Sequence, residues 1–420
     1  EIMDIGTEFG RILYECRLCK GRTLYEFIDL GLMPPADGIH SPEEIEHPET
    51  LFPLKVCQCQ DCGLTQLRYA VNPKLLYNEK YRYETSMTET GKKHFLAMAD
   101  SISNRFRFTK GSLAIDIGSN VGILLEGFKK NGLQVLGIDP APKIVKIANE
   151  RGIETWEAFM NTQVAEKILT TIGKAKLITG TNVFAHIDNK DDFIKSIHML
   201  LDHDGIFVIE VPYLVDLIEK LEYDTIYLDH LEYLSVKPLI TFFRQHGMEV
   251  FDVEKYDIHG TSIRVFVSHR GQHQVSENVQ KFLQLEEERG IYKRDVLDTF
   301  SQNVENHRRE FIDLLRDLKK QGKRIAGISA PAKGNTLLNY CKLHTDVIDY
   351  MTEKSQIKQG NYTPGMRIPI FGDERLIDDK PDYGIIFAWN FAEEIMKNNQ
   401  KFLEHGGKFI VPIPKPTVVG

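Results

Sequence analysis

The feature that most constrains the fold is an alternation of short apolar segments with amphipathic ones between residues 76 and 270. Four of the apolar segments are typical of buried strands: Leu113–Ile117, Val135–Ile138, Leu177–Thr179 and Ile206–Val211. The stretches between them show apolar residues at helical spacing. Strands that alternate with helices favour a parallel sheet covered by helices. We therefore predict a central α/β domain over residues 76–270.

Two regions of different texture flank this domain. Residues 1–75 carry five of the six cysteines and few long periodic helices, which indicates a small domain of its own. A highly charged stretch with apolar residues at helical spacing predicts two linking helices between about 276 and 321. From Arg324 onward, short apolar segments alternate with helical ones again. We predict a smaller C-terminal α/β domain over residues 271–420.

Composition and charge exclude several classes of protein. The net charge is −8 at pH 7, and the first 70 residues are acidic, which does not suit a nucleic-acid backbone. No run approaches the roughly 18 apolar residues of a membrane span. The N-terminus also lacks the basic and apolar parts of a secretory signal. We expect a cytoplasmic monomer with neither a nucleic-acid nor a membrane partner.

Two Cys-x-x-Cys pairs indicate a metal site in the N-terminal region. Cys16 and Cys19 form the first pair, and Cys59 and Cys62 form the second. Each pair can place two thiolates on one turn, and two such turns make a closed tetrahedral site for structural zinc. Cys57 competes with Cys59, but its spacing to Cys62 fits this turn less well. Reduced cysteines without metal are the alternative.

A glycine-bearing turn between the first two predicted strands favours a nucleotide-like cofactor. Its glycines follow a Gly-x-x-x-Gly pattern, which lacks the Gly-x-Gly-x-x-Gly typical of a dinucleotide site. An acidic residue ends the next strand and can bind ribose hydroxyls. The spacing fits S-adenosylmethionine, and an aromatic residue after the third strand could flank its adenine. The residues assigned to this cofactor are Asp116, Gly118, Asn120, Gly122, Asp139, Phe159 and Asn182.

Candidate catalytic groups follow two later segments of the same domain. His186 comes after a predicted strand, where α/β enzymes place their ligands. Farther along, Tyr227, Asp229 and His230 lie within four residues of one another. Histidine has an unperturbed pKa near ~6.5, which suits proton abstraction. Asp229 could orient His230 or act as the base itself. A helical surface with incidental polar residues is the alternative.

Substrate-binding candidates are spread over three segments. The first segment could form a lid, or its tyrosines could pack in the core. The second is a polar cluster near the end of the central domain. The third is a phosphate-friendly turn in the C-terminal domain, with a lysine as a point charge, although that domain could serve for dimerisation instead. The candidates are Tyr81, Tyr83, His259, Arg264, Lys333, Asn335 and Asn390.

These motifs resemble those of the three-domain sugar C-methyltransferases of deoxysugar and O-antigen pathways, which include the enzymes for tetronitrose and mycarose. The resemblance covers nearly the whole chain. It rests on the two cysteine pairs, with Cys-Gly-Leu-Thr-Gln-Leu after the second, and on the following motifs: Asp-Ile-Gly-Ser-Asn-Val-Gly, Tyr-Asp-Thr-Ile-Tyr with a nearby histidine, His-Gly-Thr-Ser-Ile-Arg, Pro-Ala-Lys-Gly-Asn-Thr-Leu-Leu-Asn and Ala-Trp-Asn.

The resemblance implies a zinc domain, a Rossmann-like class I methyltransferase domain and a C-terminal domain that helps to bind a nucleotide-linked keto-sugar. In such enzymes a base removes the proton beside a ketone, typically at C3 of a 4-keto-6-deoxyhexose, and the enolate carbon attacks the sulfonium methyl. Tyr227, Asp229 and His230 then occupy the catalytic triplet, and His186 a supporting position. The nucleotide part of the substrate could be thymidine, guanosine or cytidine diphosphate.

The chain departs from the family pattern at two positions. Asp229 stands where the family has glutamate, one methylene longer, which favours His230 as the base. Thr261 stands at the second glycine of the family's His-Gly-Gly-Ser motif. The closest rival function is O-methylation of a sugar hydroxyl, which needs only a base. The glycine pattern argues against a nucleotide-sugar epimerase or reductase. The acidic N-terminal region argues against a nucleic-acid methyltransferase.

Overall fold

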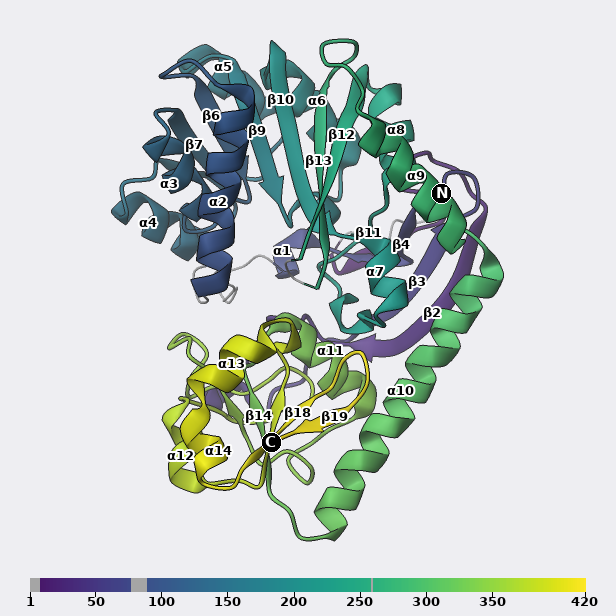
Figure 1. Cartoon of the computed structure of the whole chain (residues 1–420), viewed down its shortest axis with the longest axis vertical. Helices are drawn as coiled ribbons and strands as arrows, with labels where there is room; N and C mark the ends of the chain where they lie inside the picture. Colours follow the sequence, from purple (N-terminus) through teal and green to yellow (C-terminus); the bar gives the residue numbers. More distant parts are fainter. Residues whose placement is uncertain (1–7, 77–88, 258–259) are drawn as a thin grey trace.

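The computed structural model describes residues 8–76, 89–257 and 260–420. Figure 1 shows the central sheet and the C-terminal sheet as two separate bodies, with the strands of the N-terminal region beside and between them. A long helix, α10 (Arg294–Lys320), runs along one side of the molecule and packs on the N-terminal strand β2 (Leu24–Met33). The three predicted regions therefore form one continuous molecule.

The central domain is built on a seven-stranded sheet with the order β12-β13-β10-β9-β6-β7-β8. Strands β6 to β10 are parallel to one another, and β12 and β13 form an antiparallel pair at one edge of the sheet. All five residues of β6 are buried, as expected for a strand covered on both faces. The strands are β6 (Leu113–Ile117), β7 (Gln134–Asp139), β8 (Thr155–Glu157), β9 (Ala175–Thr181), β10 (Leu201–Pro212), β12 (Met248–Tyr256) and β13 (Ser262–His269).

Helices cover both faces of this sheet (Figure 1). The helices of the central domain are α2 (Glu89–Phe106), α3 (Ile123–Lys130), α4 (Pro142–Glu150), α5 (Thr162–Thr171), α6 (Lys190–Leu200), α7 (Leu214–Glu219) and α8 (Val236–Gln245). This domain also has two short 3-10 helices: η3 (Phe184–His186) follows strand β9, and η4 (Tyr223–Thr225) follows helix α7. The carboxyl ends of the parallel strands form the edge that bears the site.

The N-terminal sheet includes a strand from the central domain. Its order is β11-β4-β3-β2, and β11 (Glu232–Tyr233) pairs with β4 (Thr65–Leu67) so that Glu232 faces Gln66 in register. The remaining elements are β1 (Gly10–Ile12), η1 (Pro42–Glu44), β3 (Phe52–Cys59), β5 (Tyr69–Val71) and α1 (Pro73–Leu76). The chain of the central domain therefore returns to add a strand to the N-terminal sheet.

The C-terminal domain is a mostly parallel six-stranded sheet with the order β16-β15-β14-β17-β18-β19. The two predicted linking helices are α9 (Glu277–Arg289) and α10. The predicted helix near 390–404 is divided at Asn399 into α13 (Ala392–Asn398) and α14 (Gln400–Glu404). The other elements are β14 (Ile325–Ile328), α11 (Ala332–Cys341), β15 (Met351–Thr352), β16 (Ile370–Phe371), α12 (Glu374–Asp379), β17 (Tyr383–Ile386), η5 (Trp389–Phe391), β18 (Lys408–Val411) and β19 (Thr417–Val419).

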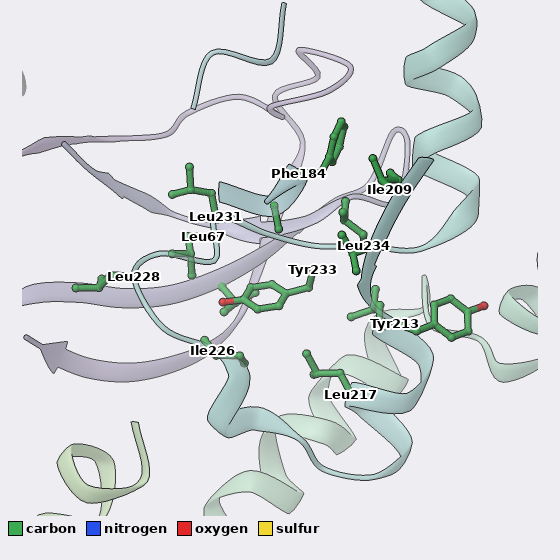
Figure 2. Close-up of a cluster of buried hydrophobic side chains, with 14 of the residues drawn as sticks. Leu67, Phe184, Ile209, Tyr213, Leu217, Ile226, Leu228, Leu231, Tyr233 and Leu234 are labelled. Atoms are coloured by element: carbon green, nitrogen blue, oxygen red, sulfur yellow. The ribbon is translucent and has the colours of Figure 1, made fainter. Parts of the chain in front are cut away.

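A continuous apolar core joins the domains (Figure 2). Leu67 of β4 lies with Phe184 of η3, Ile209 of β10 and Tyr233 of β11 in one buried cluster. Burying each side chain of this size contributes roughly 1.5–3 kcal/mol, so the N-terminal and central regions hold each other in place. In the part of the chain that the structure covers, no helix is long and apolar enough to cross a membrane.

Candidate active site

A cavity of about 610 Å³ lies at the carboxyl edge of the central sheet. All three regions contribute to its wall: Asp37 and Asn72 come from the N-terminal region, and Lys333 comes from the C-terminal domain. The central domain supplies most of the wall, including Asp139 and His230. A cavity of this size falls in the range of small-molecule and cofactor sites.

One end of the cavity is formed by the turn after β6 and by the end of β7. Asp139 accepts hydrogen bonds from the backbone N–H of Asn120 (3.0 Å) and of Ala141 (2.9 Å). Asp116 accepts one from the Thr179 hydroxyl at 2.6 Å. Burial raises the pKa of Asp116 to about 7 and also raises that of Asp139. Two buried acceptors thus face the space where a polar ligand would bind.

The glycines of this turn are required by the backbone and by its neighbours. Gly118 has φ +67° and Gly122 has φ +81°, a region that favours glycine. A Cβ at Gly118 would come within 2.9 Å of Val183, and one at Gly122 within 2.8 Å of Ile153. Gly118 lines the cavity, whereas Gly122 is the N-cap of α3 and is not among the residues that line the cavity.

The four predicted catalytic residues all line the same cavity. The Nδ1–H of His230 donates to the carbonyl of Thr225 at 2.7 Å, which leaves Nε2 as the basic nitrogen. The ring of Tyr227 lies against that of His230, with 3.9 Å between centroids. The ring of His186 meets His230 edge-on at 4.8 Å. Burial, with the nearby charges of His230 and Lys190, keeps the pKa of His186 well below its usual range.

Asp229 is a second candidate base. Its side chain is buried, and its Oδ2 has no hydrogen-bond partner among the residues that the structure describes. Burial and the charge of Asp37 raise the pKa of Asp229 to about 7. A carboxyl group in this state can exchange a proton near neutral pH.

The C-terminal domain presents Lys333 to the cavity from the start of α11. The Lys333 ammonium donates to Asn390 at 3.0 Å and lies over the ring of Trp389. The indole N–H of Trp389 donates in turn to Asp224 of η4 at 2.6 Å. A cation is thus held at the junction of the two α/β domains, where an anionic group of a ligand could reach it.

The four cysteine thiols converge apart from this cavity. The Sγ atoms of Cys16, Cys19, Cys59 and Cys62 all lie within 4.8 Å of one another, with Cys16–Cys62 at 3.5 Å and Cys19–Cys59 at 3.6 Å. Tetrahedral zinc with Zn–S bonds near 2.3 Å needs sulfurs about 3.8 Å apart, so the four thiols fit the ion. Cys57 is not part of the cluster.

Three domain models match the chain one after another. Residues 16–77 match the one described as "Putative zinc binding domain", 92–253 "Methyltransferase domain" and 257–414 "C-methyltransferase C-terminal domain". The C-methyltransferase NovU of Streptomyces niveus is 38% identical over 410 residues, which are 97% of either chain. The chain belongs to this family of three-domain C-methyltransferases. Its N-terminal domain binds zinc, and its methyl donor is S-adenosylmethionine.

Two solved methyltransferase structures are similar to part of this C-methyltransferase. A SAM-dependent methyltransferase from Anabaena variabilis is 13% identical over 45% of this chain and 98% of that chain, with a TM-score of 0.33. The plantazolicin methyltransferase BpumL is 15% identical over 43% of this chain and 86% of that chain, with a TM-score of 0.34. Scores this low add nothing to the family assignment.

The structure separates the remaining candidates of the C-methyltransferase. Asp116, Asn120, Asp139, Phe159 and Asn182 line the cavity, as the cofactor assignment requires. Arg264 is instead buried in a pair with Glu210 at 2.7 Å. Asn335 is buried and donates to the Ala36 carbonyl at 2.6 Å, which joins the first and last domains. The structure does not describe Tyr81, Tyr83 and His259, which stay predictions.

Several site residues were missed in the sequence. Asp37 lines the cavity from a Pro-rich loop of the N-terminal region, where nothing in the local pattern points to a ligand. Glu222 and Asp224 do not line the cavity themselves, but they are buried near Lys333, and each has an oxygen without a hydrogen-bond partner in the described chain. Asp224 belongs to the Tyr-Asp-Thr-Ile-Tyr motif, which was the available signal for it.

Proposed function

We propose that this C-methyltransferase methylates the carbon beside the ketone of a nucleotide-linked keto-deoxysugar, at C3 of a 4-keto-6-deoxyhexose. The observation that carries the proposal is the hydrogen bond from His230 Nδ1 to Thr225, which makes Nε2 the basic nitrogen; His230 lines the same cavity as residues predicted to bind the cofactor. A base at this position suits proton abstraction from carbon.

The reaction begins with His230. Its Nε2 takes the proton beside the ketone, and the electron pair of that C–H bond forms an enolate. His186 is neutral because of its low pKa, so its N–H can donate to the enolate oxygen and stabilise the developing charge. Bound S-adenosylmethionine supplies an electrophilic methyl group on a sulfonium. The enolate carbon bonds to that methyl carbon, and the carbon–sulfur bond breaks.

The nucleotide part of the substrate would extend toward Lys333. This ammonium is the cation that the C-terminal domain brings to the cavity, and a diphosphate is an anion that a lysine binds well. The uncharged sugar then lies nearer to His230 and Asp229. Because one chain supplies all three walls of the cavity, we also propose that the enzyme acts as a monomer.

The experiment measures hydrogen exchange separately from methyl transfer. The enzyme is incubated in deuterated water with S-adenosylhomocysteine and a panel of nucleotide-linked 4-keto-6-deoxysugars, and mass spectrometry follows deuterium beside the ketone. We expect deuterium to enter beside the ketone of one class of sugar. When S-adenosylmethionine replaces S-adenosylhomocysteine, we expect a C-methylated product. Methyl transfer to oxygen would contradict the proposal and favour a sugar O-methyltransferase.

The matched variants are His230→Asn and His203→Asn. Asparagine can still donate to Thr225 but offers no basic nitrogen, so His230→Asn should lower exchange and methyl transfer by roughly 10²–10⁴-fold. His203, whose side chain is 77% exposed, serves as the control and should leave both unchanged. Wild-type rates in His230→Asn would move the base to Asp229 or Tyr227. His186→Asn should slow methyl transfer and leave part of the exchange.

A further inference from the structure

An arginine of the zinc site reaches the segment that bears His186. Arg17 lies between the ligands Cys16 and Cys19, and its side chain is only 3% exposed. Its Nη2 donates to the carbonyl of Ile187 (3.1 Å), the carbonyl of Asp188 (2.8 Å) and the carboxylate of Asp188 (2.8 Å). Ile187 and Asp188 follow His186 directly and line the cavity with it.

The same arginine also reaches the segment that bears His230. Its Nε lies 3.3 Å from Oε1 of Glu232, a charge contact without hydrogen-bond alignment. The other oxygen of Glu232 lies 3.0 Å from the ammonium of Lys190. Lys190 also donates to the carbonyls of Phe184 and Ile187. Arg17, Lys190, Glu232 and Asp188 thus form a largely buried ion network around both segments, and Arg11 joins it from the surface through Asp188.

Backbone contacts tie the two histidine segments to this network. The N–H of Leu231 donates to the carbonyl of Ala185 at 2.9 Å, so the residues beside His230 and His186 are directly joined. Glu232 pairs in register with Gln66 of the zinc domain. The Gln66 side chain accepts from the N–H of Arg17 at 2.8 Å. Glu232 and both histidines also line one small cavity of about 20 Å³.

We propose that Arg17 is a positioning residue for methyl transfer: it fixes the ring of His186 against that of His230, and the zinc site serves as its rigid anchor. The inference rests on the roles that the proposed function gives these histidines. Arginine suits this task because its planar fork can bind two carboxylates and two carbonyls at once, whereas lysine is a point charge.

The energetics favour a positioning role over a purely stabilising one. Taking four charges out of water costs about as much as their mutual attraction returns, so buried ion networks contribute little net stability. What such a network supplies is a defined geometry. A displacement of about 1 Å caused by a mutation remote from the chemistry can cost ~10²-fold in rate, so loss of the Arg17 fork should be visible in turnover.

The test compares Arg17→Gln and Arg17→Lys with Lys20→Asn. Lys20 belongs to the same zinc turn but makes an exposed pair with Asp191 at 3.0 Å, and asparagine tolerates its φ of +62°. Steady-state kinetics are measured with S-adenosylmethionine and the keto-sugar nucleotide selected by the panel. Zinc content and S-adenosylhomocysteine affinity are measured on the same preparations.

We expect Arg17→Gln to lower kcat by roughly 10- to 100-fold, with both KM values within about twofold and one zinc per chain retained. Arg17→Lys should recover part of the loss, and Lys20→Asn should match the wild type. If Arg17→Gln does not fold, Glu232→Gln should show the same selective loss of kcat. An unchanged kcat per folded molecule, or a rise in KM alone, would overturn the inference.

The histidines provide the second readout. Side-chain ¹⁵N spectra of enzyme labelled at histidine should show the His186 and His230 signals shifted in Arg17→Gln and unshifted in Lys20→Asn. Unshifted signals in both variants would also overturn the inference. An inactive His230→Asn beside a fully active Arg17→Gln refutes only the role of Arg17, whereas an active His230→Asn refutes the proposed base.

Discussion

Two groups of buried charge border the active-site cavity, and they are built in opposite ways. Around Arg17, every charge has an opposite partner. Glu222, Asp224 and Asp229 are buried without an ion-pair partner among the described residues, and of these three only Asp229 lines the cavity. The first group therefore suits a scaffold. In the second group, Asp229 faces the cavity with an unbonded oxygen, so it suits a ligand that offers an N–H or O–H group.

The pKa values follow this difference. Burial by itself would raise the pKa of Asp188, but hydrogen bonds and charges from Arg11 and Arg17 bring it down to about 2. Burial raises the pKa of Glu222 to about 7 because Lys333 offsets only part of it. Asp229, beside Asp37, also rises to about 7. The pKa of a carboxylate therefore falls where arginines accompany it and rises where burial is largely uncompensated.

The largest expected effect comes from the zinc that anchors the paired group. Closed thiolate sites contribute roughly 10–16 kcal/mol of apparent binding free energy in small zinc domains. We expect one zinc per chain in the wild type and in Cys57→Ser, and none in Cys59→Ser, whose N-terminal domain should be cleaved rapidly by protease. Metal analysis and limited proteolysis measure both properties. If both substitutions lowered zinc content and protease resistance equally, the assignment of Cys59 rather than Cys57 as a ligand would be wrong.

The next effect concerns a single member of the paired group. Glu232→Ala removes the carboxylate that pairs with Lys190 and one of the two carboxylates that contact Arg17. Breaking a buried pair in this way should lower the free energy of unfolding by about 3–5 kcal/mol. Glu150, which makes an exposed pair with Lys146, is the control, and Glu150→Ala should cost less than about 0.5 kcal/mol. Urea unfolding gives both values; equal costs would mean that Glu232 is not paired.

A smaller effect separates the two ends of the cavity. Asp139→Ala should weaken S-adenosylhomocysteine binding by ten- to a hundredfold, about 1.5–3 kcal/mol, because a charged acceptor is lost. Lys333→Ala should weaken sugar-nucleotide binding by a similar factor. Calorimetry on both variants with both ligands measures the four affinities. Each variant should bind the other ligand with nearly unchanged affinity. If the two effects were exchanged, the proposed orientation of the ligands in the cavity would be wrong.

Local pattern was sufficient to predict most of the fold. The four apolar segments of the central domain lie inside β6, β7, β9 and β10, because strands buried on both faces are apolar throughout. The four thiols were also predicted as one cluster, since the spacing of each pair matches zinc chemistry. Two-residue strands such as β11 carry no periodicity, so its addition to the N-terminal sheet could not be predicted.

The charge pairing of the site could not be predicted either. Arg17 and Glu232 lie far apart in the sequence, and each resembles an ordinary surface residue until the fold joins them. The reverse holds for Arg264 and Asn335. Both belong to motifs that look like binding loops, yet the structure gives their side chains partners in the protein interior. Motifs indicate which segments approach the site, whereas the packing decides which side chains face it.

The smallest expected effect is a pH dependence that only the unpaired group should produce. The pKa of Asp229 is about 7 in the folded enzyme and near ~3.9 when unfolded. A raised folded value means that its contribution to stability is complete below pH ~4 and is lost as the pH rises through 7. From pH 5.5 to 7.5, Asp229 should therefore lower the free energy of unfolding by about 1–2 kcal/mol.

Urea unfolding of the wild type and Asp229→Asn at these two pH values isolates this contribution, because Asp116, Glu222 and Asp224 act equally in both proteins. As the pH rises, the free energy of unfolding of the wild type should fall relative to that of Asp229→Asn. Asp188→Asn is the control from the paired group: its pKa of about 2 places its titration below this window, so its gap to the wild type should stay constant. A constant gap for Asp229→Asn would mean that Asp229 is already ionised and paired. Saturating keto-sugar nucleotide should reduce the wild-type slope, because a sugar hydroxyl that donates to Asp229 favours the carboxylate.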